Sequence, residues 1–341
     1  MHRRASAEAL SRFSLDLLSA AGASPDSAEA ATWAMMHASL HGVDTHGVRL
    51  LPWYADALST GLVKGAPEIR ITHPRRAAAR VDADGGLGHL AMYRAMDEAC
   101  ALARDCGIGM AAVVNSTHFG AAGAYTLAAA QAGFIGLVTA NSGAFVVPHG
   151  GSSPVHGTNP ISVAAPNPDG DPFLLDMATS SIPWNRVLRY RTEGLSLPPG
   201  TAVDADGSFV TDPHQAAALA PVGGADFGYK GAALAGVAEV LGGVLTGMRL
   251  SVEQDRQQIA DTALGHFVLA IDPTLFMPLA AFGTRLQSYL EAFDREPGTM
   301  AAGGPEWRHR LEREEQGIPL PDGLRAELHA AADKAGIAFT L

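Results

Sequence analysis

The chain has 341 residues, 47% of them hydrophobic and 17% charged, which is the composition of a globular protein and enough length for two compact units. Its formal net charge of −11 argues against a nucleic-acid partner, because phosphate binding needs a basic face. Its two cysteines, Cys100 and Cys106, are too few for a disulfide framework or a four-cysteine zinc site, and we expect both on one helix as small buried residues.

The N-terminus is basic and then apolar, but Glu8, Arg12 and Asp16 interrupt its apolar part. A signal peptide needs an unbroken apolar core, so this segment is predicted to be an amphipathic helix. The longest apolar runs are far shorter than the ~18 residues that would span a bilayer. We therefore expect a cytoplasmic protein with no membrane partner.

The first 61 residues are predicted to be helical. Helices are expected at 6–21 and 25–41, with Ser24 as the cap of the second, and a third helix begins at Pro52. The connection between the last two, LHGVDTHGVRLLPWY (40–54), concentrates two histidines, an aspartate and an arginine on a piece of backbone with two glycines.

From residue 68 onward, predicted strands and helices alternate, which indicates an α/β architecture. Residues 195–215 have the composition of a loop, and the tail from residue 284 is predicted to be mostly helical. The expected strands are 68–74, 77–84, 109–116, 135–142, 160–166, 173–180 and 265–273, and the expected helices are 89–107, 124–134 and 231–247.

One glycine motif, Gly86 to Ala91, fits the dinucleotide pattern GxGxxA between a strand and a helix. The acidic residue that should end the next strand is missing, since that strand runs to Asn115 and Ser116. A glycine turn with close packing of strand and helix is therefore favoured over a Rossmann site.

Six blocks of sequence follow one another in a specific order. Their succession resembles the malate/L-lactate dehydrogenase family, which also contains ureidoglycolate, sulfolactate and 2,3-diketogulonate enzymes and cyclic-imine carboxylate reductases. The blocks are HGVDTHGV (41–48), NSTHFGAAGAY (115–125), GTNPISVAAP (157–166), LLDMATS (174–180), YKGAALAGVAEVLGGVLTG (229–247) and GHFVLAIDP (265–273).

The resemblance implies an α/β fold in which a non-Rossmann sheet domain, flanked by helices, binds NAD or NADP. A mainly helical domain is formed from the N- and C-terminal parts. We expect the divisions 1–75 (helical, with the histidine turn), 76–225 (cofactor-binding sheet domain) and 226–341 (helices and a strand packing back on the N-terminal part). The family's members are typically homodimers. The implied reaction moves a hydride between nicotinamide and C2 of a small 2-hydroxy or 2-oxo acid, or a cyclic imine carboxylate.

Such a reaction needs a group that takes or gives a proton, and histidine is suited to this because its ordinary pKa lies near neutrality. By resemblance to the family's Ser-His-Gly triplet, His46 is the proton carrier and Thr45 supplies the hydroxyl beside it. Asp44 or Asp56 is a candidate to orient the imidazole. His118, at a strand end, is the second candidate for the proton carrier and is also expected near nicotinamide.

The substrate carboxylate calls for a cation. Arg49 is the candidate, although related sequences often place arginine one position later, where this chain has Leu50. His149 is predicted to help shape the substrate pocket, and His41 is expected to be structural at a helix end.

The cofactor is expected to contact three later blocks and the turn after His118. Lys230 is predicted just before a helix, where the dipole disfavours a cation, so a role facing a ligand is expected. Arg186 would meet a 2′-phosphate if the cofactor is NADP. The expected cofactor residues are His118, Gly120, Gly157, Thr158, Asn159, Asp176, Met177, Ala178, Thr179, Ser180, Lys230 and Gly231.

Two other classes of function stay open. His41, Asp44 and His46 have the composition of a ligand cluster for a metal-dependent hydrolase or lyase, although no compact helical ligand spacing is present. A non-catalytic protein that retains a dinucleotide site would keep the cofactor blocks and should have lost His46, which is present. We expect no metal site and a small substrate with a carboxylate.

Overall fold

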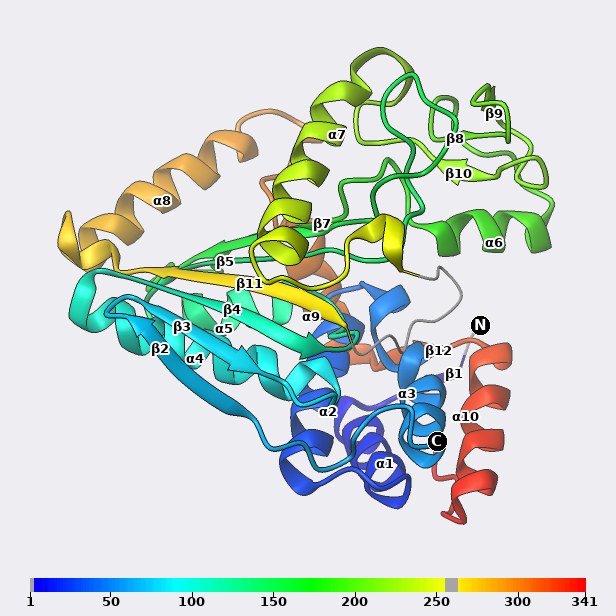
Figure 1. Ribbon diagram of the computed structural model, residues 1–341, viewed down its shortest axis with the longest axis horizontal. Helices are drawn as coiled ribbons and strands as arrows, with labels where there is room; N and C mark the ends of the chain where they lie inside the picture. Colours follow the sequence, from blue (N-terminus) through cyan, green and yellow to red (C-terminus); the bar gives the residue numbers. More distant parts are fainter. Residues whose placement is uncertain (1–2, 255–262) are drawn as a thin grey trace.

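A mixed sheet of seven strands crosses the middle of the molecule and has helices on both faces (Figure 1). The computed structural model describes residues 3–254 and 263–341. The strand order is β2-β3-β4-β11-β5-β6-β7, and β3 and β4 form the parallel pair, whereas the other neighbours are antiparallel. The strands are β2 (Arg70–Arg75), β3 (Ala78–Asp82), β4 (Ile108–Ser116), β5 (Ile135–Ala140), β6 (Ile161–Ala165), β7 (Phe173–Met177) and β11 (Leu264–Ile271).

Strand β11 lies at the centre of the sheet, between β4 and β5. Most of its side chains are buried, and a strand buried on both faces needs a neighbour on each side. The expected division of the chain places this strand with the segment that packs back on the N-terminal part. In the structure it pairs with β4 and β5 of the sheet.

Helices α4 (Gly88–Cys106) and α5 (Gly123–Gln131) cover one face of the sheet. Both cysteines lie on α4 as predicted, Cys100 buried and Cys106 partly exposed. At its start, a Cβ on Gly88 would lie 2.4 Å from the carbonyl oxygen of Thr117. The glycine motif therefore serves close packing, which confirms the prediction made for it.

The opposite face carries α7 (Gly224–Glu239), which continues in a π-helical turn at Val240–Val244. Beyond it lies a small unit of α6 (Trp184–Glu193) and a three-stranded sheet of β8 (Ala202–Val203), β9 (Phe209–Val210) and β10 (Ala218–Leu219). The expectation of a loop at 195–215 is wrong where β8 and β9 pair. Helix α7 also begins earlier than predicted, because Gly223 and Gly224 take the left-handed backbone at φ 97° and 57° and start it there.

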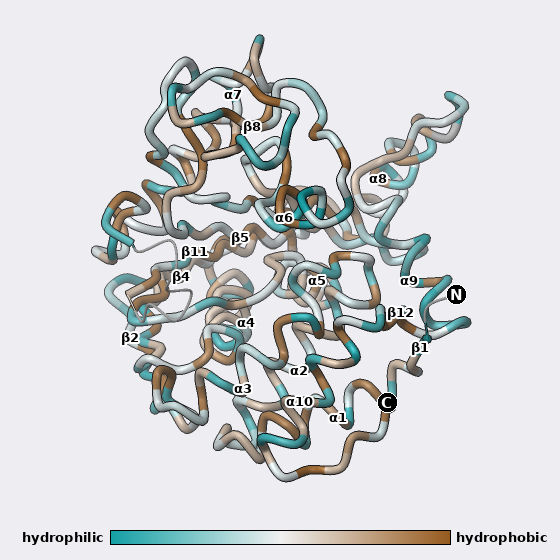
Figure 2. The backbone as a smooth tube through the Cα atoms, turned by 90° about the vertical axis from the view of Figure 1, so that its right-hand side faces the viewer, coloured by the Kyte–Doolittle hydropathy of each residue, from teal (hydrophilic) through white to brown (hydrophobic). Residues whose placement is uncertain are grey.

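The helices at the two ends of the chain share one hydrophobic core below the sheet. Figure 2 shows three layers: these terminal helices, the sheet, and α7 with β8. Ser24 caps the second helix as predicted, accepting from the backbone N–H of Ser27 at 3.4 Å. Near the C-terminus, α8 and α9 precede β12, which pairs with β1, and the last helix, α10. The elements are β1 (Arg3–Ala5), α1 (Ala7–Ala20), α2 (Pro25–Leu40), α3 (Leu51–Ser59), α8 (Leu279–Asp294), α9 (Gly304–Gln316), β12 (Ile318–Leu320) and α10 (Asp322–Ala335).

The fold is thus α/β, with a helical unit built from both ends of the chain, as predicted. Four short 3-10 turns complete it: Asp44–His46 (η1), Val48–Leu50 (η2), Ser251–Glu253 (η4) and Pro273–Leu275 (η5). None of the helices within the described residues has the length and apolar character needed to cross a bilayer.

Candidate active site

One edge of the sheet gathers the ends of five adjacent strands. At this edge Ser116 of β4 pairs with Leu264 of β11, and His266 of β11 pairs with Ala140 of β5. Thr139 of β5 pairs with Ile161 of β6, which in turn pairs with Met177 of β7. The segments that enter or leave the sheet at this edge therefore include the predicted blocks after β4, before β6 and after β7. The topology brings together pieces of sequence that are more than 60 residues apart.

The two candidate histidines meet near this edge. His46 on η1 and His118 after β4 stack with ring centroids 5.7 Å apart and planes 18° from parallel. The Thr45 hydroxyl lies 2.9 Å from Nδ1 of His46. Neither carboxylate proposed to orient His46 does so, because Asp44 pairs with Arg313 and Asp56 pairs with Lys334.

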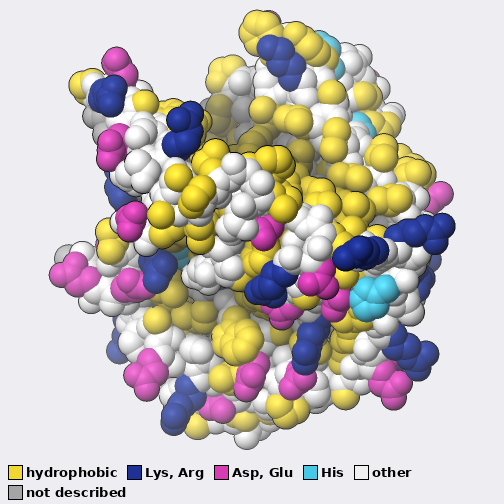
Figure 3. Space-filling view, turned by 90° about the vertical axis from the view of Figure 1, so that its left-hand side faces the viewer, with side chains coloured by type: hydrophobic (Ala, Val, Ile, Leu, Met, Phe, Trp, Pro, Cys, Tyr) yellow, Lys and Arg dark blue, Asp and Glu magenta, His cyan; other side chains and the backbone are white. Residues whose placement is uncertain are grey.

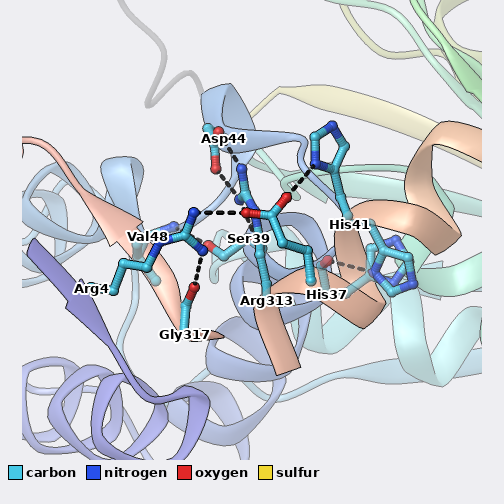
Figure 4. Close-up of polar contacts among 10 residues, drawn as sticks. Arg4, His37, Ser39, His41, Asp44, Val48, Arg313 and Gly317 are labelled. Atoms are coloured by element: carbon cyan, nitrogen blue, oxygen red, sulfur yellow. Dashed lines mark hydrogen bonds and ion pairs between the residues drawn. The ribbon is translucent and has the colours of Figure 1, made fainter. Parts of the chain in front are cut away.

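The turn that carries His46 is held by a residue from the far end of the chain. Arg313 of α9 is buried and donates to the carbonyl of Ser39 and to both carboxylate oxygens of Asp44, one of them at 3.0 Å (Figure 4). The Ser39 hydroxyl accepts the backbone N–H of Val48 at 3.0 Å. A Cβ on Gly47 would lie 2.2 Å from the same hydroxyl oxygen, so only glycine fits at this position without a shift of Ser39.

A tyrosine hydroxyl also contacts His118. Tyr54 of α3 is fully buried, and its hydroxyl lies 2.6 Å from Nδ1 of His118. The backbone N–H of Gly120 donates to the same nitrogen at 3.3 Å. Sequence analysis gave Tyr54 no role, and its position in a helix of the expected pattern carries no signal of this contact.

The histidines of the cluster are neutral at pH 7. Burial lowers the pKa of His46 and, with His46, His89 and His266 as neighbours, lowers the pKa of His118 well below its ordinary value. Burial also lowers the pKa of His89 to about 3 and of His266 to about 4. Either ring of the stacked pair can therefore supply a nitrogen lone pair or an N–H at neutral pH, according to its tautomer.

Two predicted cofactor blocks lie side by side. The backbone N–H of Thr179 donates to the carbonyl of Thr158 at 2.8 Å, and the Thr179 hydroxyl donates to the carbonyl of Asn159 at 3.1 Å. Ser180 and Gly157 are buried with them, and Gly157 donates its backbone N–H to the Ser251 hydroxyl. Met177 and Ala178 lie partly exposed where β7 ends.

Asn159 is committed to internal bonds rather than to an open turn. Its amide donates to the carbonyl of Ala235 at 3.1 Å and to the carboxylate of Glu239 at 3.0 Å, and its oxygen accepts the backbone N–H of Ser142 at 3.2 Å. Glu239 also accepts from Ser251. This network ties the turn to the end of α7, and sequence analysis missed Glu239 and Ser251.

Asp176 belongs to β7 and lies against the first turn of α5. Its carboxylate accepts the backbone N–H of Gly123 at 2.8 Å, while burial raises its pKa to about 7. A cavity of about 300 Å³ lies beside it, lined in part by Leu174, Met300 and Glu306. Residues 300–306, before and at the start of α9, therefore form a wall of this cavity, whereas the sequence alone assigns the charged stretch 299–316 neither to a cofactor site nor to a solvated surface.

Lys230 lies within α7, not before it, so the helix-dipole argument for its role is wrong. Its ammonium group lies 5.2 Å from the ring centroid of Phe227, and the side chain is exposed. Gly231 is buried against Val222, whose backbone N–H donates to Thr179 and so connects α7 to the cofactor blocks.

Three further candidates lie on the surface. His149 contacts Tyr229 on α7 with ring centroids 5.9 Å apart, which places it beside Lys230. Arg49 is exposed on η2, next to the His46 turn, and Arg186 is exposed on α6.

The proposed metal cluster does not converge on one point. His41 directs Nδ1 to the carbonyl of His37 at 2.7 Å and packs its ring on Trp307, Asp44 pairs with Arg313, and His46 faces His118. Within residues 3–254 and 263–341, no group of three or more His, Cys, Asp or Glu side chains is placed to hold a metal ion.

Comparison with known proteins agrees with this arrangement. Residues 5–329 match the malate/L-lactate dehydrogenase family. The chain is 35% identical to malate dehydrogenase of Pyrococcus horikoshii, over 89% of this chain and 87% of that one, and 31% identical to ureidoglycolate dehydrogenase (NAD(+)) of Escherichia coli, over 86% and 84%. The crystal structure of malate dehydrogenase from Entamoeba histolytica superposes with a TM-score of 0.93 at 27% identity, covering all of both chains. The chain therefore belongs to the malate/L-lactate dehydrogenase family and is an oxidoreductase of that family.

Proposed function

We propose that this protein transfers a hydride between the nicotinamide of NAD or NADP and C2 of a small 2-hydroxy or 2-oxo acid, or of a cyclic imine carboxylate. The observation that carries the proposal is the stacked pair His46 and His118 at the sheet edge that also bears the loops 157–160 and 176–180. The relatives named malate dehydrogenase, ureidoglycolate dehydrogenase and pyrroline/piperideine-2-carboxylate reductase support this range of substrates.

The residues present fit a dinucleotide. The cavity beside Asp176 has room for part of one, and the Asp176 carboxyl group, which borders it, can accept a hydrogen bond from a sugar hydroxyl. Exposed Lys230 on α7 is a suitable partner for a phosphate, and the buried Gly231 next to it lets α7 approach Val222 closely. The bound cofactor supplies the carbon that takes or gives the hydride.

The chain's own groups handle the proton and the carboxylate. His46, supported by Thr45 at 2.9 Å, takes the alcohol proton in oxidation and returns it in reduction. Arg49, exposed one turn along from His46, is the candidate to bind the substrate carboxylate through two hydrogen bonds.

The test is a binding measurement followed by an activity screen. Calorimetry should show binding of NADH or NADPH, and the comparison of the two decides the preferred cofactor. Loss of absorbance at the nicotinamide band should then appear with a member of a panel of 2-oxo acids and cyclic imine carboxylates. If neither nucleotide binds at millimolar concentration, the dehydrogenase proposal is wrong.

A homodimer is the proposed assembly. Helix α7 and the π-helical turn that continues it expose a row of apolar side chains, Phe227, Leu234, Val237 and Val240 among them, and such patches mark contact surfaces. Figure 3, which faces the side of the molecule where α8 lies, shows hydrophobic side chains spread over its centre and upper right, and charged ones at the upper left and over the lower part. Sedimentation equilibrium should give twice the chain mass.

The cytoplasmic location and the three-part division of the chain stay predictions.

A further inference from the structure

Two hydrogen-bond donors point at one nitrogen of His118. The hydroxyl of Tyr54 lies 2.6 Å from Nδ1, and the backbone N–H of Gly120 donates to the same atom at 3.3 Å. A backbone N–H can only donate, so Nδ1 has to offer its lone pair. The hydroxyl of Tyr54 then also donates, and the single proton of the neutral ring lies on Nε2.

The surrounding backbone and packing keep both donors in place. Gly120 has φ 75°, a left-handed conformation that aims its N–H at the ring and that other residues adopt with strain. Tyr54 is fully buried with its ring edge against His89, and burial raises its pKa well above the ordinary value, so its hydroxyl keeps its proton.

Within residues 3–254 and 263–341, no neighbour supplies a charge that would change this assignment. The ionisable groups of these residues that face His118 are His46 from η1, His89 from α4, His266 from β11 and Tyr54 from α3. His266 places Nε2 within 3.2 Å of the carbonyl of Thr117, which only accepts, so it too is a neutral ring with its proton on Nε2.

We propose that His118 acts only as a hydrogen-bond donor through Nε2–H, held in that tautomer by Tyr54 and Gly120, and that His46 alone carries the proton. This division of roles rests on the proposed dehydrogenase function. Tyr54 is then a positioning residue, and the Nε2–H of His118 binds the substrate's C2 oxygen or carboxylate.

The proton balance supports this division. To accept the alcohol proton, a ring needs a free lone pair, and the only lone pair of neutral His118 already receives two donors. Giving up Nε2–H would leave an imidazolate. His46 differs, because its Nδ1 faces the Thr45 hydroxyl, which can accept or donate, so its Nε2 can be bare or protonated. In oxidation the O–H proton goes to Nε2 of His46, while the hydride leaves C2 and the C=O bond forms.

The tautomer can be measured directly. Nitrogen-15 NMR of histidine-labelled protein at pH 7 should show one ring with an unprotonated Nδ1 and a protonated Nε2 that disappears in His118→Gln. This measurement needs no substrate, so it decides the tautomer even if the dehydrogenase proposal fails. A proton on Nδ1 of His118, or an imidazolium at pH 7, would overturn the inference.

Substitution by glutamine separates a donor from a proton carrier, because its side-chain amide can donate near the Nε2 position and cannot exchange a proton at neutral pH. Turnover of His118→Gln should stay within about tenfold of wild type, and that of His118→Ala should fall further, by roughly 10–100-fold, the size of a hydrogen bond to a charged group. His46→Gln and His46→Ala should both fall by about 10²–10⁴-fold.

The opposite pattern would also be decisive. If His118→Gln is as slow as His118→Ala while His46→Gln stays active, His118 is the proton carrier and the inference is wrong. Circular dichroism of each variant and its calorimetric affinity for NADH confirm that fold and cofactor binding are kept. Absence of turnover by the wild type with every substrate counts against the proposed function instead.

Discussion

The lysine on α7 offers the sharpest test of where the cofactor phosphates bind. Lys230 is exposed, and its nearest described contacts are the rings of Phe227 and Tyr229. We predict that Lys230→Ala raises the dissociation constant of NADH roughly tenfold or more, the size of a charge-assisted hydrogen bond. Calorimetry measures this, with Lys334→Ala as the control, because Lys334 pairs with Asp56 at the helical unit. Equal affinities for Lys230→Ala and wild type would contradict the prediction.

Single residues could be chosen from the sequence, but their partners could not. The resemblance pointed to His46 and His118, and these two do stack. Their supports come from distant positions: Tyr54 is 64 residues from His118, and Arg313 is 269 residues from Asp44. Local pattern carries no information on such pairs, which is why Asp44 or Asp56 was expected to orient His46, whereas they pair with Arg313 and Lys334.

At the level of elements, α9 acts as a support for the short turn η1. Arg313 is 6% exposed and bonds both Ser39 and Asp44, so its loss leaves a buried carbonyl without its donor. We predict that Arg313→Ala lowers the free energy of unfolding by about 2–3 kcal/mol, below the full value for a buried pair because Asp44 is partly solvated. Turnover should fall as well, since the turn carries His46, whereas NADH affinity should not change.

Denaturant titration and steady-state kinetics measure these two effects. The matched control is Glu312→Gln. Glu312 is the neighbour of Arg313 on α9, and this change breaks its more exposed ion pair with Arg4 of β1. Exposed pairs contribute little, so this variant should resemble wild type. Equal losses for both variants would mean that α9 as a whole, rather than the Arg313 contact, supports the turn.

Elements with a strong period were predictable and irregular ones were not. Every strand of the large sheet was predicted, and Ser24 located the start of α2. The strands β8 and β9 have two residues each, too few to show a period, and α6, which was not predicted, buries Val187 alone among its residues. The start of α7 depends on left-handed glycines, whose conformation only the folded chain reveals.

For the whole molecule, buried histidines make stability depend on pH. Burial lowers the pKa of each, so below about pH 6.5 the unfolded chain takes up protons that the folded chain does not. Stability should therefore fall as the pH drops from 7.5 to 5.5, by roughly 1 kcal/mol for each ring whose folded pKa lies below 5.5, as it does for His89 and His266. The histidines are His37, His41, His46, His89, His118 and His266.

Asp176 works in the opposite direction. Its pKa is raised to about 7, so its protonated form adds stability that is lost as the pH rises through that value. One carboxyl does not offset six histidines. Urea titrations at pH 7.5 and 5.5 measure the net effect, and His89→Phe, which removes a buried ring without bonded partners, should make the slope shallower. Stability that is flat or rises toward pH 5.5 would contradict this assignment.

The central position of β11 has a consequence for how the protein is made. Strands β2-β3-β4 and β5-β6-β7 touch each other only through β11, which follows both in the chain. While the chain is being synthesised, β4 and β5 each keep an unpaired edge until residues 264–271 have emerged, and unpaired edges favour aggregation. A chain stopped before Leu264 would leave β4, which leads to His118, and β7, which carries Asp176, in two half-sheets that no strand pairing joins.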